Sequence, residues 1–409
     1  MRIIVACQRI FFLACYFNRY RNNGLGKGKD NMTTASQAVA KPSGQSVVAQ
    51  LSLLDRFLPL WIFITMAVGV GIGAVAPGIK EVFNALSIGT VSAPIALGLL
   101  WMMYPVLAKV RYEELGRITQ AGRQFSVSLT LNWLIGPAVM FALAWLFLPN
   151  DPGFRTGLII VGLARCIAMV LIWNMLAGGD NEYCAVLVAL NSVFQIIMYS
   201  PLAYFYLKVV PEWLGLPGTI VHITMWDIAK SVLIFLGIPL AAGIITRFYF
   251  LRRRGREWYE TQLMPRLGPT ALIGLLFTIV VMFAMQGDRI LAQPLDVLRV
   301  AIPLVAYFVL MFFVSFGLSA LLRFKYEMAA TQSFTAASNN FELAIAVAVG
   351  TFTIASQEAL ATVIGPLIEV PVLIGLVYVA LWMKRAWFQA AAAVPQPLAA
   401  QDSTPASGI

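Results

Sequence analysis

The sequence predicts an all-α membrane protein with ten transmembrane helices. Of its 409 residues, 60% are hydrophobic and only 12% are charged, whereas a soluble domain usually carries about 25% charged residues. This composition and the mean hydropathy of +0.80 exclude a disordered chain and an ordinary water-soluble domain. A helix needs about 20 apolar residues to cross a bilayer. Ten stretches are long enough, at about 57–77, 84–107, 125–149, 156–177, 183–207, 229–249, 268–286, 297–322, 328–353 and 359–383.

Stretches of this length form helices rather than barrel strands, because a helix satisfies its own backbone hydrogen bonds in lipid. Connecting segments rich in Lys and Arg mark the cytoplasmic side. These segments fall on the same side as the N-terminus, at 109–123, 247–266, 323–325 and 384–385. We therefore expect a multi-pass protein of the cell membrane with both termini in the cytoplasm.

The spans divide into two halves of five, which we place at 57–227 and 228–386. The longest external connection, 209–230, joins them. An odd number of spans in each half makes the halves inverted relative to each other, as in many secondary transporters. Spans four and nine then correspond. Both carry polar residues in an apolar stretch, so we expect both helices to be discontinuous.

The two ends of the chain differ from the apolar body. Residues 1–56 are predicted to be a cytoplasmic extension without a fixed fold, and residues 387–409 a cytoplasmic tail. A cleaved signal peptide is disfavoured, because no small-residue cleavage site follows the apolar run 1–17. A start at Met32 is the favoured alternative, and whether residues 1–31 are translated stays open.

Several function classes lack their residues in this sequence. The four cysteines form no CxxC pair and no zinc spacing, so neither a disulfide framework nor a metal cofactor is expected. The sequence lacks the Gly-rich phosphate-binding loop of nucleotide hydrolases, so we do not expect an ATPase. The net charge of +10 need not mean a nucleic-acid partner, since Lys and Arg orient membrane loops. The basic run 252–256 fits an anchor at anionic lipid headgroups.

Arg165 and Cys166 are the most informative residues of span four. A charge in the bilayer centre costs at least about 2.5–3.5 kcal/mol, so Arg165 should face the protein interior and have an acidic partner. It is either half of a structural ion pair or a fixed charge in a substrate or proton path. Cys166 is either a small buried apolar residue or a soft ligand. Cys184 has no charged neighbour and is expected in the core.

Two carboxylates lie in the last spans. Glu342 and Glu369 are suited to take up and release a proton in each transport cycle. The structural alternatives are an ion pair with Arg165 for Glu342, and a hydrogen bond beside Pro366 and Pro371 for Glu369. Asn191 in span five and Asn340 in span nine either hydrogen-bond a neutral hydroxylated solute or join neighbouring helices.

Three long motifs then occur in order: residues 102–115 (MMYPVLAKVRYEEL), 162–192 (beginning GLARCIAMV) and 336–372 (beginning AASNNFELAIA). Together they resemble the arsenite permeases of the bile/arsenite/riboflavin transporter superfamily, over about residues 51–386. The resemblance implies that helices four and nine are unwound where they cross. It also implies efflux of arsenite, and of antimonite in some members, in exchange for protons.

The resemblance places the family's cysteine on Cys166 and its ninth-helix glutamate on Glu342. Arg165, Asn191, Asn340 and Glu369 fall on polar positions that the family also uses. We therefore expect Cys166, Arg165, Asn191 and Asn340 to bind substrate, and Glu342 and Glu369 to couple protons. The expected partners are arsenite, protons and the lipid bilayer, with no nucleic acid and no ATPase subunit.

The main alternative is a sodium-coupled organic-anion carrier of the bile-acid type on the same scaffold. Asn339, Asn340 and Glu342 supply oxygen atoms for sodium, but such a carrier gives no reason for Arg165 and Cys166. An intramembrane enzyme lacks a second helical His or Asp for its site. A receptor would have an odd number of spans, and a passive channel would not work against a pH gradient.

Overall fold

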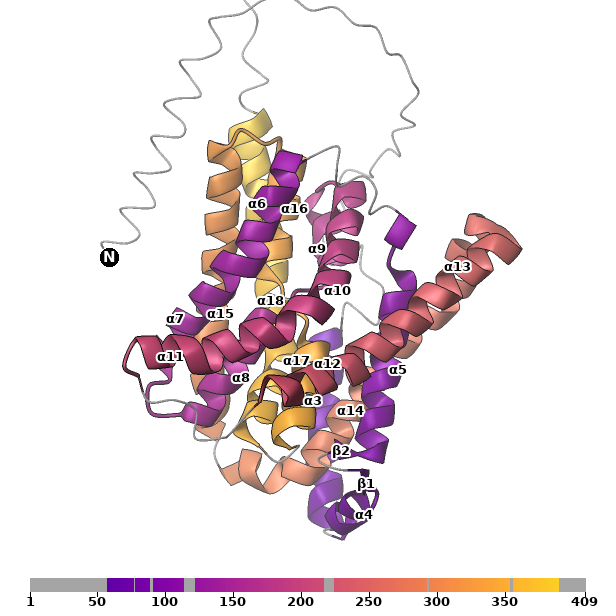
Figure 1. The fold of residues 1–409 in the computed structure, drawn as a ribbon, viewed down its shortest axis with the longest axis vertical. Helices are drawn as coiled ribbons and strands as arrows, with labels where there is room; N and C mark the ends of the chain where they lie inside the picture. The colour runs from indigo at the N-terminus through magenta and orange to yellow at the C-terminus, as the bar shows by residue number, and fades with distance from the viewer. Residues whose placement is uncertain are drawn as a thin grey trace, which may run out of the picture.

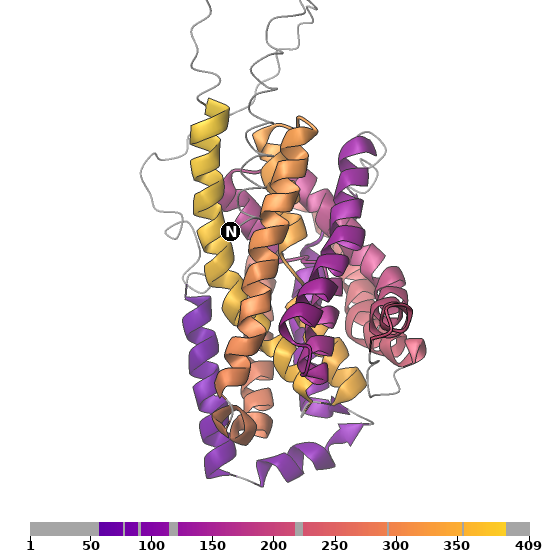
Figure 2. The same ribbon diagram turned by 90° about the vertical axis from the view of Figure 1, so that its left-hand side faces the viewer.

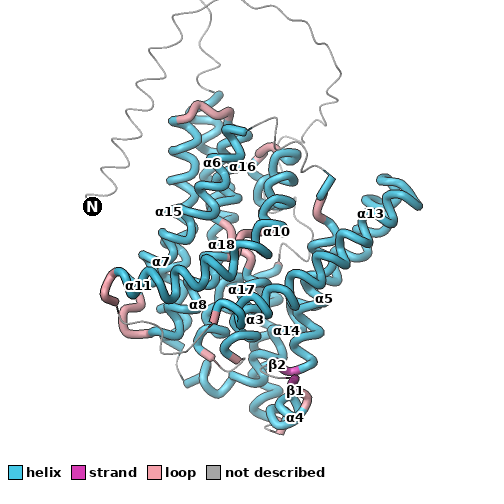
Figure 3. Tube along the Cα trace, viewed as in Figure 1, coloured by secondary structure: helices cyan, strands magenta, loops and turns pink. Residues whose placement is uncertain are grey.

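The computed structural model describes residues 57–76, 78–88, 91–113, 122–216, 224–292, 294–353 and 356–389, and nearly all of them are helical (Figures 1 and 3). The predictions for residues 1–56, and for all but the first three residues of the tail 387–409, lie outside these ranges. The all-helical membrane class is confirmed. The division into ten spans of two inverted repeats stays a prediction.

A short helix and two short strands connect the first two long helices. Helix α3 (Leu58–Val75) is followed by α4 (Ile79–Ala85), by the two-residue strands β1 (Ser87–Ile88) and β2 (Val91–Ser92), and by α5 (Ala93–Lys109). The strands are antiparallel, with Ser87 opposite Ser92. The second apolar helix therefore begins at Ala93 rather than at residue 84. Helix α4 and the strands lie at the lower end of the molecule (Figures 1 and 2).

The next helices contain the first break. Helix α6 (Gly122–Thr130) continues through the π-helical segment Leu131–Ile135 into α7 (Gly136–Phe147). Helix α8 (Pro152–Leu163) then ends inside an apolar stretch, and α9 (Met169–Ala177) begins after five non-helical residues. Helix α9 ends at Gly178, whose φ of 69° is left-handed. The segment after it comprises α10 (Asn181–Tyr204), the π-helical Phe205–Val209 and α11 (Val210–Trp213).

The second half has the same kind of interruption. Helix α12 (Met225–Val232) runs through Leu233–Gly237 into α13 (Ile238–Trp258), and Tyr259–Leu263 leads into α14 (Met264–Ala292). Helix α15 (Pro294–Leu321) precedes α16 (Tyr326–Ala337) and α17 (Phe341–Phe352), which are separated by three residues. Helix α18 (Gln357–Met383) and the π-helical Lys384–Gln389 complete the described chain.

The helices pack in two groups. Helix α14 packs against α3 and α5, and α5 packs against α13, while α7, α8, α15, α16, α17 and α18 form the second group. The two groups meet where α5 contacts α17 and α3 contacts α18, while α12 contacts α10 and α17. Helix α13 extends away from the bundle (Figure 1). Five helical segments among the described residues are long and apolar enough to cross a membrane, and the two halves of each broken helix are shorter. Large apolar side chains such as Leu146, Ile197 and Ile245 are exposed, as lipid contact requires.

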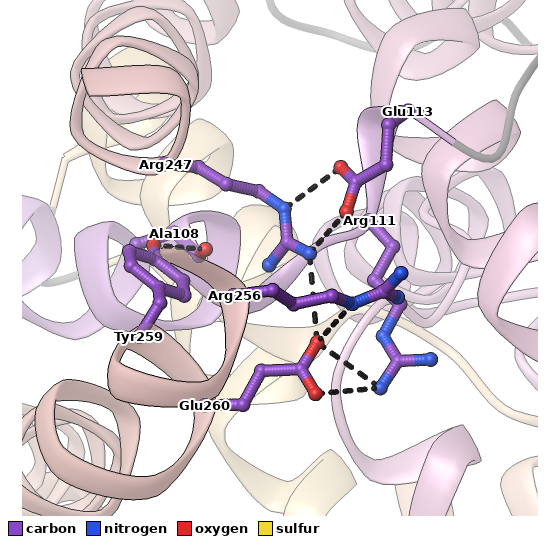
Figure 4. Close-up of polar contacts among 7 residues, drawn as sticks. All are labelled: Ala108, Arg111, Glu113, Arg247, Arg256, Tyr259 and Glu260. Carbon is purple, nitrogen blue, oxygen red and sulfur yellow. Dashed lines mark hydrogen bonds and ion pairs between the residues drawn. The ribbon is translucent and has the colours of Figure 1, made fainter. Parts of the chain in front are cut away.

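A polar cluster joins α13 to the segment that follows α5 (Figure 4). The buried guanidinium of Arg247 pairs with the Glu113 carboxylate, and its Nη2 lies 3.8 Å from Glu260 Oε1. Glu260 also binds Arg111 at 3.3 Å and Arg256 at 3.1 Å. Partial burial alone would raise the pKa of Glu113, but the hydrogen bonds from Arg247 hold that pKa below its ordinary value.

Candidate functional site

The two helix breaks are bonded to each other. Arg165, just after α8, forms an isolated antiparallel bridge with Asn339, just after α16. The amide of Asn340 donates to the carbonyl of Ala164 at 3.0 Å. The non-helical residues of one break thus supply partners for the other, as buried backbone in a membrane requires. The predicted discontinuities in spans four and nine are present, and they meet.

Amide side chains complete this junction. Asn339 donates through Nδ2 to the carbonyls of Val161 at 2.7 Å and Ala164 at 3.3 Å. The side-chain oxygen of Asn340 accepts from the amide of Leu343 at 3.0 Å and so caps the first turn of α17. Each asparagine keeps one buried atom without a partner in the described part of the chain, Oδ1 in Asn339 and Nδ2 in Asn340.

Arg165 is completely buried, but its partners are not acidic. Its Nη1 donates to the hydroxyl of Tyr307 at 2.8 Å and to the carbonyl of Ala336 at 3.4 Å. Its Nη2 donates to the carbonyl of Gly162, while Nε has no partner among the residues that the structure describes. No ion pair of Arg165 occurs among the described residues, so the expected acidic partner was wrong there. The carbonyl-bearing ends of two half-helices take its place.

Cys166 lies in the first break, beside Arg165 in the chain. Its thiol is buried and reduced, and Sγ accepts from the amide of Val170 at 3.4 Å. Cys184 is also a buried free thiol, 4.0 Å from the carbonyl of Val170, which agrees with its expected place in the core. Among the two, only Cys166 belongs to the non-helical junction.

The two carboxylates approach the same junction from the second half. Glu369 on α18 is 3% exposed, and its Oε1 accepts from the amide of Asn339 at 3.3 Å. Glu342 is in the first turn of α17, where the helix dipole favours a negative charge, and its side chain is partly exposed. Both carboxylates are near enough to Cys166 to interact with it electrostatically.

Asn191 on α10 is linked to the junction through Gln195. Its side-chain oxygen accepts from Trp133 Nε1 at 3.1 Å, and its Nδ2 has no partner within the described ranges. One turn later, Gln195 donates to the carbonyl of Asn191 at 3.1 Å and accepts from the amide of Arg165 at 3.0 Å. The structure therefore places the six predicted site residues in or beside one junction.

Sequence reasoning missed Tyr307 on α15. Its hydroxyl is the nearest side-chain partner of Arg165, and the residue is fully buried. In the sequence it is one aromatic residue in a long apolar stretch, with no polar neighbour that would single it out. A tyrosine in the middle of an apolar span, where no interface explains it, is the only available signal.

Broken helices that meet inside a helical membrane protein, with polar side chains at the breaks, define a secondary transporter. Residues 96–293 match the model of the Sodium Bile acid symporter family. The chain is 55% identical to the Arsenical-resistance protein Acr3 of Corynebacterium glutamicum over 352 residues, which are 86% of this chain and 94% of that protein.

Two further relatives cover similar lengths. An uncharacterized transporter of Synechocystis is 35% identical, over 82% of this chain and 91% of its own. The Arsenical-resistance protein Acr3 of Alkaliphilus metalliredigens is 32% identical, over 83% and 95%. The chain therefore belongs to the arsenite permease family, whose members are secondary transporters and not enzymes.

Proposed function

We propose that this chain exports arsenite from the cell in exchange for protons and so confers resistance to arsenicals. Antimonite is a second candidate substrate. The family membership supports an arsenical as the cargo, since the relative that is 55% identical is named for arsenical resistance. The observation that carries the proposal is the thiol of Cys166, which lies at the junction of the two helix breaks with two carboxylates near it.

The chemistry of arsenous acid suits this junction. The acid is uncharged at neutral pH, so it needs soft and hydrogen-bonding ligands rather than a counter-ion. Sulfur of Cys166 is the soft ligand. Three buried donors have no partner among the described residues and can bind hydroxyl oxygens: Asn191 Nδ2, Asn340 Nδ2 and Arg165 Nε. A single thiol allows capture and release, whereas three would hold the metalloid too tightly for transport.

Glu342 is the proposed proton carrier, with Glu369 as the second group to test. Glu342 lies in the first turn of α17, directly after the second break, while Glu369 is buried and hydrogen-bonded to that break. Membrane-embedded carboxylates are the usual proton-exchanging groups of transporters. Neither carboxylate forms an ion pair with Arg165 among the described residues, which leaves both free to titrate.

The proposed layout is ten spans in the inverted halves 57–227 and 228–386, with both termini in the cytoplasm and no ATPase subunit. Basic segments between the spans support that orientation. A sodium-coupled organic-anion carrier is the second candidate, because the matching family model is described as one of sodium symporters. Replacing sodium at constant pH separates the two, since only that carrier would lose transport.

Everted membrane vesicles provide the test. We expect arsenite to accumulate when a pH gradient, acidic inside, is imposed, and accumulation to cease when the gradient is collapsed. Accumulation that is indifferent to the gradient would refute proton exchange, and no accumulation at all would refute arsenite as the substrate.

Two variants assign the roles. Cys166→Ser should reduce arsenite transport by at least about tenfold, which corresponds to about 1.4 kcal/mol, while Cys184→Ser should retain it because Cys184 lies outside the break. Equal arsenite transport by Cys166→Ser and Cys184→Ser would exclude a role of the Cys166 thiol in transport. Glu342→Gln should abolish the proton movement that follows arsenite addition, and persistence of that movement would direct the test to Glu369→Gln.

A further inference from the structure

We propose that the guanidinium of Arg165 acts as a tethered cation, which fills the place between two half-helix ends where a transporter of this construction would otherwise bind a coupling cation such as sodium. The consequence is that the transport cycle needs no sodium. That consequence rests on the proposed transport function, but the occupied cation place can be tested without it.

The carbonyls at the ends of α8 and α16 make this place attractive to a cation. The last carbonyls of a helix have no partner within the helix and carry the negative end of its dipole. In α8 the carbonyl of Gly162, and in α16 the carbonyl of Ala336, accept from the same guanidinium. Half-helix ends of this kind coordinate the coupling ion in transporters with broken helices.

Neighbouring side chains supply the rest of the shell. The hydroxyl of Tyr307 accepts from Arg165 Nη1 at 2.8 Å and lies 3.4 Å from the carbonyl of Ala336. A Cβ on Gly136 of α7 would lie 2.7 Å from Nη1 and 3.1 Å from the Tyr307 oxygen. The glycine therefore leaves room for the guanidinium, which is enclosed by α7, α8, α15 and α16.

The surroundings of Arg165 favour a role as a tethered cation over a role in an ion pair with a carboxylate. Arg165 is completely buried, and a buried charge must be compensated. No carboxylate pairs with it among the described residues, whereas two helix ends and a hydroxyl do contact it. If the guanidinium were removed, the carbonyl of Gly162 would lose this donor, and the buried carbonyl of Ala336 would keep only the hydroxyl of Tyr307 at 3.4 Å. A small monovalent cation is the species that restores both the charge and these contacts.

The first test removes the side chain and offers sodium. The midpoint of thermal unfolding is measured for the full-length protein in detergent, in sodium chloride and in choline chloride of equal strength. Arg165→Ala should be stabilised by sodium by about 3 °C relative to choline when sodium is about ten times its dissociation constant. The wild type and Arg165→Lys should show no difference between the salts.

Arg155→Ala is the matched control. Arg155 is also buried and donates to the carbonyls of Leu148 at 3.2 Å and Pro149 at 2.8 Å, but it lies away from the breaks. It should show no sodium effect. An absent sodium effect in Arg165→Ala, or an equal one in Arg155→Ala, would overturn the proposal.

A second pair of variants keeps the test decisive if Arg165→Ala does not fold. Arg165→Lys retains a tethered charge, and Arg165→Met has similar length without one. We expect the lysine variant to yield more folded protein and to unfold at a higher temperature. If it is no better than the methionine variant, the charge is not needed and the proposal fails. These readouts do not involve arsenite, so their failure leaves the proposed transport function to its own vesicle test.

Discussion

Removing the hydroxyl of Tyr307 tests how the buried guanidinium is held. In Tyr307→Phe, Arg165 Nη1 loses its 2.8 Å acceptor and keeps only the carbonyl of Ala336 at 3.4 Å. A buried donor left unsatisfied costs about 1–3 kcal/mol, and more when it is charged. We therefore expect the free energy of unfolding to fall by about 3 kcal/mol.

Tyr199→Phe is the matched control. Tyr199 is equally buried, and its hydroxyl donates to the carbonyl of Ile160 at 2.8 Å, so its loss breaks a bond between two neutral groups. That loss should cost about 1 kcal/mol. Thermal unfolding in detergent, followed by tryptophan fluorescence, should show midpoints lowered by about 6 °C for Tyr307→Phe and about 2 °C for Tyr199→Phe. A Tyr307→Phe variant no less stable than Tyr199→Phe would refute the reasoning.

Two further predictions concern packing and pH. Gly136→Ala should destabilise the protein by about 1–3 kcal/mol, because the new methyl group overlaps the buried guanidinium, whereas Gly317→Ala, with nothing within 4 Å of its added carbon, should be neutral or stabilising. Thermal unfolding measures the stability of both variants. Equal changes in stability would contradict the close approach of Gly136 to the Arg165 guanidinium. The pKa of Glu113 is lower in the folded protein than its ordinary value of 4.5, so its ionised form stabilises the fold. That contribution is complete above pH 4.5 and is lost as the pH falls through the lowered pKa. Glu113→Gln should therefore unfold more easily than the wild type near neutral pH, with the difference narrowing below about pH 4.5. If the difference in stability between Glu113→Gln and the wild type stayed constant with pH, the ion pair between Glu113 and Arg247 would not be its cause.

The sequence predicts where the site lies, but it does not predict which groups contact Arg165 there. Arg165 and Cys166 were predicted within a broken span, and the structure has them at a break that pairs with the second one. The expected acidic partner of Arg165 was wrong among the described residues. Sequence reasoning balances a charge with another charge, and it does not count the partial charges that helix ends provide.

The sequence by itself determined the class of this protein. Its apolar stretches are long enough to require helices in a membrane, and the polar residues inside two of them mark the places where those helices end. Both properties are local, so they can be read from neighbouring residues.

Only the tertiary structure decided what those helix ends do. Arg165 is bonded to Tyr307, 142 positions away, and to Ala336, 171 positions away. No local pattern specifies such pairs, because they depend on how the packed helices bring their ends together. The fold thereby supplies a completely buried arginine with carbonyl and hydroxyl partners that composition and spacing do not reveal.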